Sequence, residues 1–176
     1  MKPLEIADKI KEKFPLEVLD VTSFRDQVSV TVKKDRIISI CKYLYEDTDI
    51  RMDYLSDLCG VDYPERRFRF EAVYNLYSLK HKHGIRIKAL IPGKDPSIDS
   101  VVQIWRGANW YEREASDMFG IIFNGHPDLR RILMPEDWEG YPLRKDYPLK
   151  GPENREYEGY EKIKELHTHD DEWGIK

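Results

Sequence analysis

The sequence predicts an α+β fold, in which helices pack on a mainly antiparallel sheet and an extended, proline-rich segment follows. Three observations predict it. Apolar residues recur at helical spacing near the N-terminus, two central stretches alternate apolar with polar residues, and half of the ten prolines lie between Pro127 and Pro152. A length of 176 residues favours one domain with an appendage. We therefore expect an α+β body over 1–122 and an extended C-terminal segment over 123–176 that wraps a partner.

The first fifty residues have the patterns of two helices and a hairpin. Pro3 occupies a first-turn position, and Val28 to Val32 alternates with polar residues. The predicted elements are a helix over about 3–13, strands over 16–24 and 28–32 linked at 25–27, and a second helix capped by Asp35 that contains Ile37, Cys41 and Leu44.

The middle of the chain contains the clearest hairpin. Apolar and polar residues alternate over 68–79, and a partner strand follows at 85–91. His81 and His83 lie in the predicted turn beside lysines, so we expect solvated histidines there rather than a metal pair. For 55–67, turn-forming residues favour a short strand that leads into a loop.

Two further helices are predicted before the prolines begin. Asp99 or Ser100 can cap a helix that continues through Trp105, and a second helix runs from about 109 to 119. Gly120 follows it at the position where helices commonly end.

Charge and composition exclude several classes of protein. The net charge of −4 comes from residues 151–176, which hold 4 basic and 8 acidic side chains, while the rest is balanced. Such balance argues against nonspecific nucleic-acid binding. Neither a membrane-spanning run nor a signal-peptide pattern is present. Cys41 and Cys59 are far apart without a CxxC spacing, and we expect both to be buried apolar residues.

A group of charged residues on the 109–119 helix has two interpretations. Glu112, Arg113, Glu114 and Asp117 resemble a catalytic cluster, which together with His126 suggests a stand-alone enzyme. No nucleophile with a supporting turn accompanies them. We therefore predict a structural ion-pair network among these four residues, with Arg113 bound to Asp117 one helical turn away.

The proline-rich stretch is too apolar for a solvated linker and too rich in proline for a helix or a central strand. Its cations lack the glycine-rich loop of a phosphate site, so acidic protein surface is the better partner. We expect the partner interface to include His126, Arg130, Arg131, Trp138, Tyr141, Arg144, Lys145 and Tyr147.

Three motifs in this half of the chain resemble a known family. They are ERE-x-x-D-M-F-G at 112–120, GHPDLRRIL at 125–133 and DWEGYPLRKDYPL at 137–149. Together they resemble the signature of the 30 kDa subunit family of respiratory complex I, which in bacteria is the C subunit of NADH:quinone oxidoreductase. The resemblance covers most of the chain, with a departure at Ser116, where an aromatic residue is usual.

This resemblance implies a non-catalytic, structural subunit without a cofactor of its own, in an assembly that passes electrons from NADH to quinone and translocates protons. FMN and iron–sulfur clusters would lie in partner subunits. The implied partners are the 49 kDa-like subunit, the small cluster-bearing subunit and the ferredoxin-like subunit. The implied location is peripheral, on the cytoplasmic side of the bacterial inner membrane. The equivalent subunit of a membrane-bound [NiFe] hydrogenase or formate hydrogenlyase is the alternative.

Overall fold

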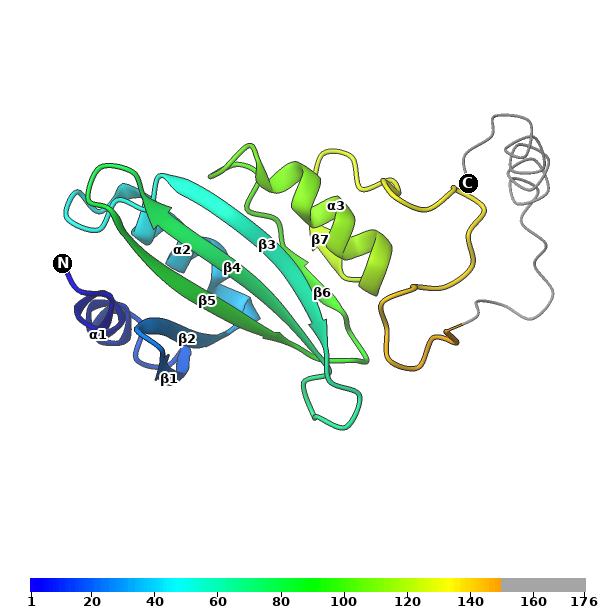
Figure 1. Cartoon of the computed structure of the whole chain (residues 1–176), viewed down its shortest axis with the longest axis horizontal. Coiled ribbons are helices and arrows are strands. Elements are labelled where there is room, and N and C mark those ends of the chain that lie inside the picture. Colours follow the sequence, from blue (N-terminus) through cyan, green and yellow to red (C-terminus); the bar gives the residue numbers. More distant parts are fainter. Residues whose placement is uncertain (150–176) are drawn as a thin grey trace, which may run out of the picture.

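The structure is a computed structural model that describes residues 1–149 of the chain. Its centre is a five-stranded sheet in the order β1-β2-β5-β4-β3 (Figure 1). All neighbouring strands are antiparallel except β2 and β5, which are parallel, so the mainly antiparallel sheet is confirmed. The strands are β1 (Val18–Phe24), β2 (Gln27–Lys33), β3 (Tyr54–Asp62), β4 (Phe70–Ser78) and β5 (His83–Ile91).

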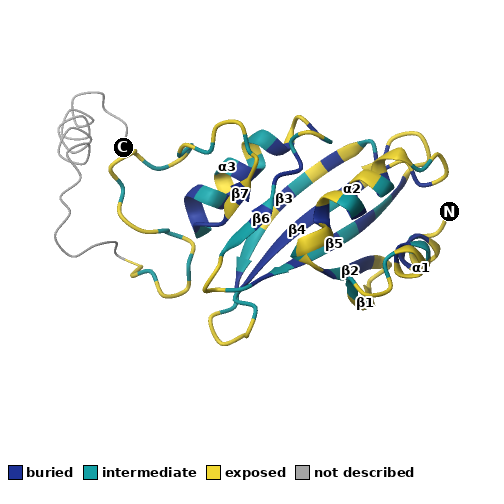
Figure 2. Cartoon of the chain, turned by 180° about the vertical axis from the view of Figure 1, so that it is seen from behind, coloured by how far each residue is buried: buried dark blue, intermediate teal, exposed yellow. Residues whose placement is uncertain are grey.

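Two helices cover one face of this sheet. α1 (Pro3–Lys13) lies beside β1 and β2, and α2 (Ile37–Glu46) crosses the face behind β4 and β5 (Figure 2). A short 3-10 turn, η1 (Lys34–Arg36), leads into α2. Burial on β5 alternates strictly, which shows that one sheet face carries the core.

α3 (Ala108–Phe119) packs beside the edge strand β3, where the Tyr111 hydroxyl donates to the Ser56 carbonyl oxygen at 3.2 Å. Two short parallel strands flank α3, β6 (Ser97–Asp99) before it and β7 (Ile122–Asn124) after it. Phe119 of α3 lies over Gly60, where an added Cβ would come within 2.6 Å of its ring. α3 is therefore held at the β3 edge at both ends.

Most predicted elements are confirmed, namely the N-terminal helix, both hairpins, the second helix and the 109–119 helix with Gly120 at its end. The strand over 54–62 is longer than predicted because β4 pairs along almost its full length. Across residues 1–149, no helix is long and apolar enough to cross a membrane.

Several local predictions are wrong. The helix predicted through Trp105 is a single turn, because Asp99 is used in pairing with β7 and Gly107 follows. Asp35 does not cap α2, since it lies in η1.

His83 is buried at the start of β5 and not solvated, with Nε2 bonded to the Ile50 carbonyl oxygen at 2.8 Å. His81, in the turn before it, is exposed as predicted. Cys41 is buried as predicted, but Cys59 is exposed, because it lies on the sheet face that α1 and α2 leave uncovered.

Candidate partner-binding segment

After β7 the chain continues as an extended stretch, residues 125–149, here called the proline-rich segment (Figure 1). It contains no helix or strand, and none of its residues is fully buried. The boundary predicted between 122 and 123 falls inside β7, which pairs with β6. The remainder of the predicted C-terminal segment, 150–176, lies outside the described residues.

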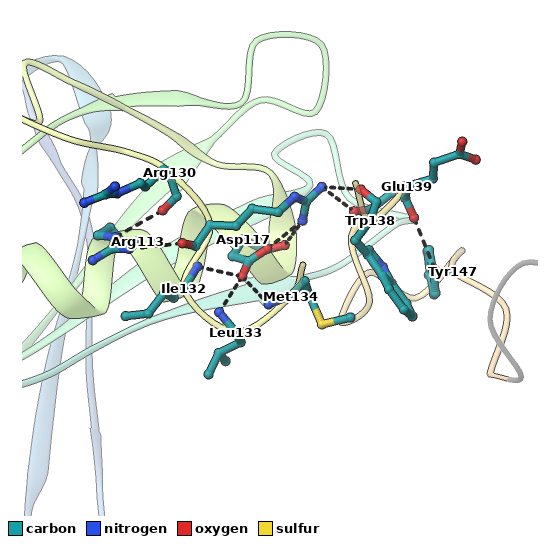
Figure 3. Close-up of polar contacts among 11 residues, drawn as sticks. Arg113, Asp117, Arg130, Ile132, Leu133, Met134, Trp138, Glu139 and Tyr147 are labelled. Atoms are coloured by element: carbon teal, nitrogen blue, oxygen red, sulfur yellow. Dashed lines mark hydrogen bonds and ion pairs between the residues drawn. The ribbon is translucent and has the colours of Figure 1, made fainter. Parts of the chain in front are cut away.

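Asp117 of α3 is the first point at which the body holds this segment (Figure 3). Its Oδ2 accepts the backbone N–H groups of three consecutive residues at 2.8 to 3.1 Å, and its Oδ1 accepts from the Arg131 guanidinium. Burial of the carboxyl favours its neutral form, but these donors outweigh burial and hold the pKa of Asp117 below its usual value. The three donors are the N–H groups of Ile132, Leu133 and Met134.

Arg131 connects Asp117 to the next turn of the segment. Besides its ion pair with Asp117, its Nη2 donates to the carbonyl oxygens of Trp138 and Gly140 at 2.9 and 3.2 Å. Arg113 of α3 donates to the carbonyl oxygens of Arg130 and Arg131 at 3.1 and 3.0 Å. Two arginines thus bond four carbonyls that no regular secondary structure would satisfy.

A second carboxylate, Asp62 at the end of β3, holds residues 145–146. Arg69 bonds both oxygens of Asp62 at 2.8 and 3.0 Å, and the Lys145 N–H donates to Oδ2 at 2.7 Å. Arg69 also pairs with Asp146 at 2.7 Å. Burial raises the pKa of Asp62, but Arg69 and the Lys145 N–H lower it by more, so the carboxyl is held below its usual pKa.

Between these two contacts the segment crosses the end of α3. Arg144 donates to the Phe119 carbonyl oxygen at 2.6 Å, and its guanidinium lies 4.3 Å from the Tyr141 ring centre. Gly120 has a φ of 71°, and a Cβ there would lie 2.6 Å from the Tyr141 ring. Glycine is required for both the helix end and this close approach.

His126 fixes the start of the segment. Its Nδ1 accepts the Asp128 N–H at 3.0 Å, so Nε2 carries the proton and donates to the Asn109 carbonyl oxygen at 3.2 Å. Both ring nitrogens therefore have structural partners, which leaves neither available as a catalytic base in this state.

The predicted ion-pair network differs in its partners. Asp117 pairs with Arg131 and not with Arg113, because its side chain lies under the proline-rich segment. Glu112 is fully buried and accepts from the Ser100 hydroxyl at 2.6 Å and the Val101 N–H at 2.7 Å. Glu114 is exposed. The set is therefore divided into separate contacts, and it does not assemble with His126 as a catalytic group.

The residues expected at a partner interface also divide into two groups. Arg131, Tyr141 and Arg144 contact the body or the segment itself, while Arg130 and Lys145 are exposed. Trp138, Tyr147 and His126 are half-buried, and the Tyr147 hydroxyl donates to the Glu139 carbonyl oxygen at 3.2 Å.

Two leucines face solvent between these contacts, Leu133 at 62% and Leu143 at 49% exposure. The anchoring roles of Asp62 and Arg69 were missed, because no local pattern links them to residues more than seventy positions away.

Comparison with known proteins places these features in a family. Residues 30–153 match the model described as the respiratory-chain NADH dehydrogenase, 30 Kd subunit. The C subunit of NADH-quinone oxidoreductase from Geobacter sulfurreducens is 49% identical over 86% of this chain and 93% of its own length. The same-named protein of Roseiflexus castenholzii is 48% identical over 80% of this chain and 81% of its own length.

Two solved structures are similar. A trypsin-resistant fragment of Nqo5 is 27% identical, with a TM-score of 0.64 over 73% of this chain and 100% of that one. A chain from the membrane-bound sulfane sulfur reductase, an archaeal respiratory membrane complex, is 25% identical, with a TM-score of 0.70 over 93% of this chain and 91% of that one.

Proposed function

Because the chain belongs to the respiratory-chain NADH dehydrogenase 30 Kd subunit family, we propose that it is a structural subunit of a proton-translocating NADH:quinone oxidoreductase. Its α+β body serves as a platform, and the proline-rich segment binds the neighbouring subunit. The observation that carries this proposal is the segment itself, which is held at Asp117 and Asp62 yet has no fully buried residue. Such a surface is shaped in advance for a partner.

The partner we propose for this segment is the 49 kDa-like subunit, with the small cluster-bearing and ferredoxin-like subunits completing the surroundings. The exposed leucines supply apolar contact area, while Arg130 and Lys145 remain exposed to pair with acidic groups on the partner. Arg131 and Arg144 act through the shape of the segment, since their guanidinium groups already have internal partners.

We place the chain peripherally, on the cytoplasmic side of the bacterial inner membrane, with FMN and iron–sulfur clusters in the partner subunits. Its two cysteines cannot supply the four thiolates that such clusters usually need. In residues 1–149 no group of three or more His, Cys, Asp or Glu side chains is arranged to hold a metal ion. The relatives at 48–49% identity favour this complex over the hydrogenase alternative.

The assembly experiment uses the complex purified from cells. Replacing both Leu133 and Leu143 by Ser should leave the chain folded, since both are exposed, but should reduce its co-purification with the 49 kDa-like subunit by about tenfold or more. Leu79→Ser is the matched control, because Leu79 is 61% exposed in the turn after β4 and should have no effect. Normal assembly of the double variant would remove the leucines from the interface.

The cofactor proposal is tested on the purified full chain. Iron analysis and visible absorbance should show neither iron nor flavin. Stoichiometric iron would contradict the proposed structural role while leaving the family assignment intact.

A further inference from the structure

A cavity of about 520 Å³ lies at the end of the sheet where β5 begins, at the opposite end of the molecule from the proline-rich segment (Figure 1). Its walls are the start of α1, the β1–β2 turn, the end of β4 and the first residues of β5. The volume is within the range of small-molecule sites, about 300–1,000 Å³. The assembly role proposed above does not use this cavity.

The cavity is lined by more positive than negative side chains. Lys2, Lys82 and Arg86 line it, against the single carboxylate of Asp26. Within residues 1–149, none of these three cations has a carboxylate partner within ion-pair distance. Two positive charges are therefore left over in a partly apolar site, which favours an anion.

Arg86 is held in place without being neutralised. Its Nε donates to Asn75 Oδ1 at 2.8 Å, and its Nη2 donates to Gln27 Oε1 at 3.1 Å. Both amides also line the cavity. Because these partners are neutral, the guanidinium keeps its charge, and Nη1 has no hydrogen-bond partner among the described residues. A fixed arginine with free donors suits the planar, two-point binding of a phosphate.

Apolar side chains complete the lining. Val28 of β2, Leu76 of β4 and Ile85 of β5 are almost fully buried at its walls. A fully hydrated inorganic ion would gain nothing from these side chains, whereas an organic group attached to a phosphate would cover them.

We propose that this cavity is a binding site for a small organic phosphate, a phosphomonoester whose phosphate binds at Arg86, Lys82 and Lys2. A phosphomonoester carries about two negative charges at neutral pH, which matches the two uncompensated positive charges of the lining. Its organic part lies against Val28, Leu76 and Ile85. This site is independent of the proposed docking function, so either proposal can fail without the other.

The test uses phenyl phosphate as the probe, added to the isotope-labelled full chain at constant ionic strength. The amide signals of Gly84, Ile85 and Arg86 should shift and saturate in the range up to about 20 mM, and Arg86→Gln should weaken binding by about tenfold. Lys88→Gln is the matched control, because it removes the same charge from β5 outside the cavity and should leave binding within about twofold.

Two outcomes overturn the site. Absence of shifts in the wild-type chain is one, and equal weakening by Arg86→Gln and Lys88→Gln is the other, since it would indicate charge alone. Lys82→Gln, at an exposed turn, replaces Arg86→Gln if that variant does not fold. Inorganic phosphate should bind more weakly than phenyl phosphate. Equal affinity would remove the apolar wall from the proposal.

Discussion

Asp117 and Glu112 are both buried on α3, yet their carboxyl groups have opposite pKa shifts. Asp117 has four donors from the proline-rich segment, and these outweigh burial. Burial raises the pKa of Glu112 to about 7, because the Ser100 hydroxyl and the Val101 N–H lower it only in part. The number of donors that reach each carboxyl therefore decides its charge state.

Asp117→Asn tests the first of these carboxyls. The amide removes the charge and supplies a single oxygen where Oδ1 and Oδ2 accept four donors, so the free energy of unfolding should fall by about 2–3 kcal/mol in urea titrations. Asp128→Asn is the control, because Asp128 has an exposed pair with Arg130 and should change stability by less than about 1 kcal/mol. Equal effects would show that Asp117 does not carry the contact.

Glu112 predicts a pH dependence of stability. Its folded pKa is about 7, above the usual value of 4.5, so the folded state binds the proton more tightly. Its contribution is fully present below about pH 4.5 and is lost as the pH rises through 7, with a total of the order of 3 kcal/mol. In Glu112→Gln, urea titrations at pH 6 and pH 8.5 should show a smaller difference than in the wild type. An unchanged difference would assign the dependence to another group.

At the scale of elements, β7 decides where the body ends. The sequence pattern places the boundary at 122, but the pairing of Ile122–Asn124 with β6 makes these residues part of the body. Phe123 is buried in the core, which gives β7 an apolar contribution as well as backbone hydrogen bonds.

Two truncations separate these possibilities. A chain ending at residue 124 keeps β7 and should unfold cooperatively, whereas a chain ending at residue 121 loses Phe123 and should be less stable by about 3 kcal/mol or more. Both lack the proline-rich segment, so the difference reports β7 alone. Thermal unfolding followed by circular dichroism measures it, and equal melting temperatures would return the boundary to 122.

At the scale of the whole molecule, the contacts at Asp117 and Asp62 change how the proline-rich segment meets a partner. A segment that orders only on binding loses about 1–2 kcal/mol of backbone entropy per fixed residue at that step. Here much of that cost is already met within the chain, because the N–H groups of residues 132–134 and Lys145 are bonded to buried carboxylates. Binding can then be stronger for the same contact area.

Hydrogen exchange of the isolated full chain tests this arrangement. The amides of residues 132–134 and of Lys145 should exchange at least about tenfold more slowly than an unstructured peptide without any partner present. Asp117→Ala should remove the protection at 132–134 and leave that at Lys145, which depends on Asp62. Unprotected amides in the wild-type chain would mean that the segment orders only on binding.

Local patterns were sufficient for much of the fold and for the family motifs. The helix over 3–13, the helix that ends at Gly120 and the hairpin of β4 and β5 were predicted because periodicity and capping are short-range. The motifs over 112–149 identified the family in the same way. They could not indicate that Arg131 and Arg144 bind within the chain.

Tertiary structure decided the remaining features, because they depend on residues far apart in sequence. The parallel pairing of β2 with β5, the pairing of β6 with β7, and the bond from Asp62 to Lys145 all join distant positions. Which carboxyl on α3 is charged follows from whether the proline-rich segment returns over it. By itself the sequence determined the elements and the family. Only the folded chain determined which charged residues hold the segment and which remain exposed for a partner.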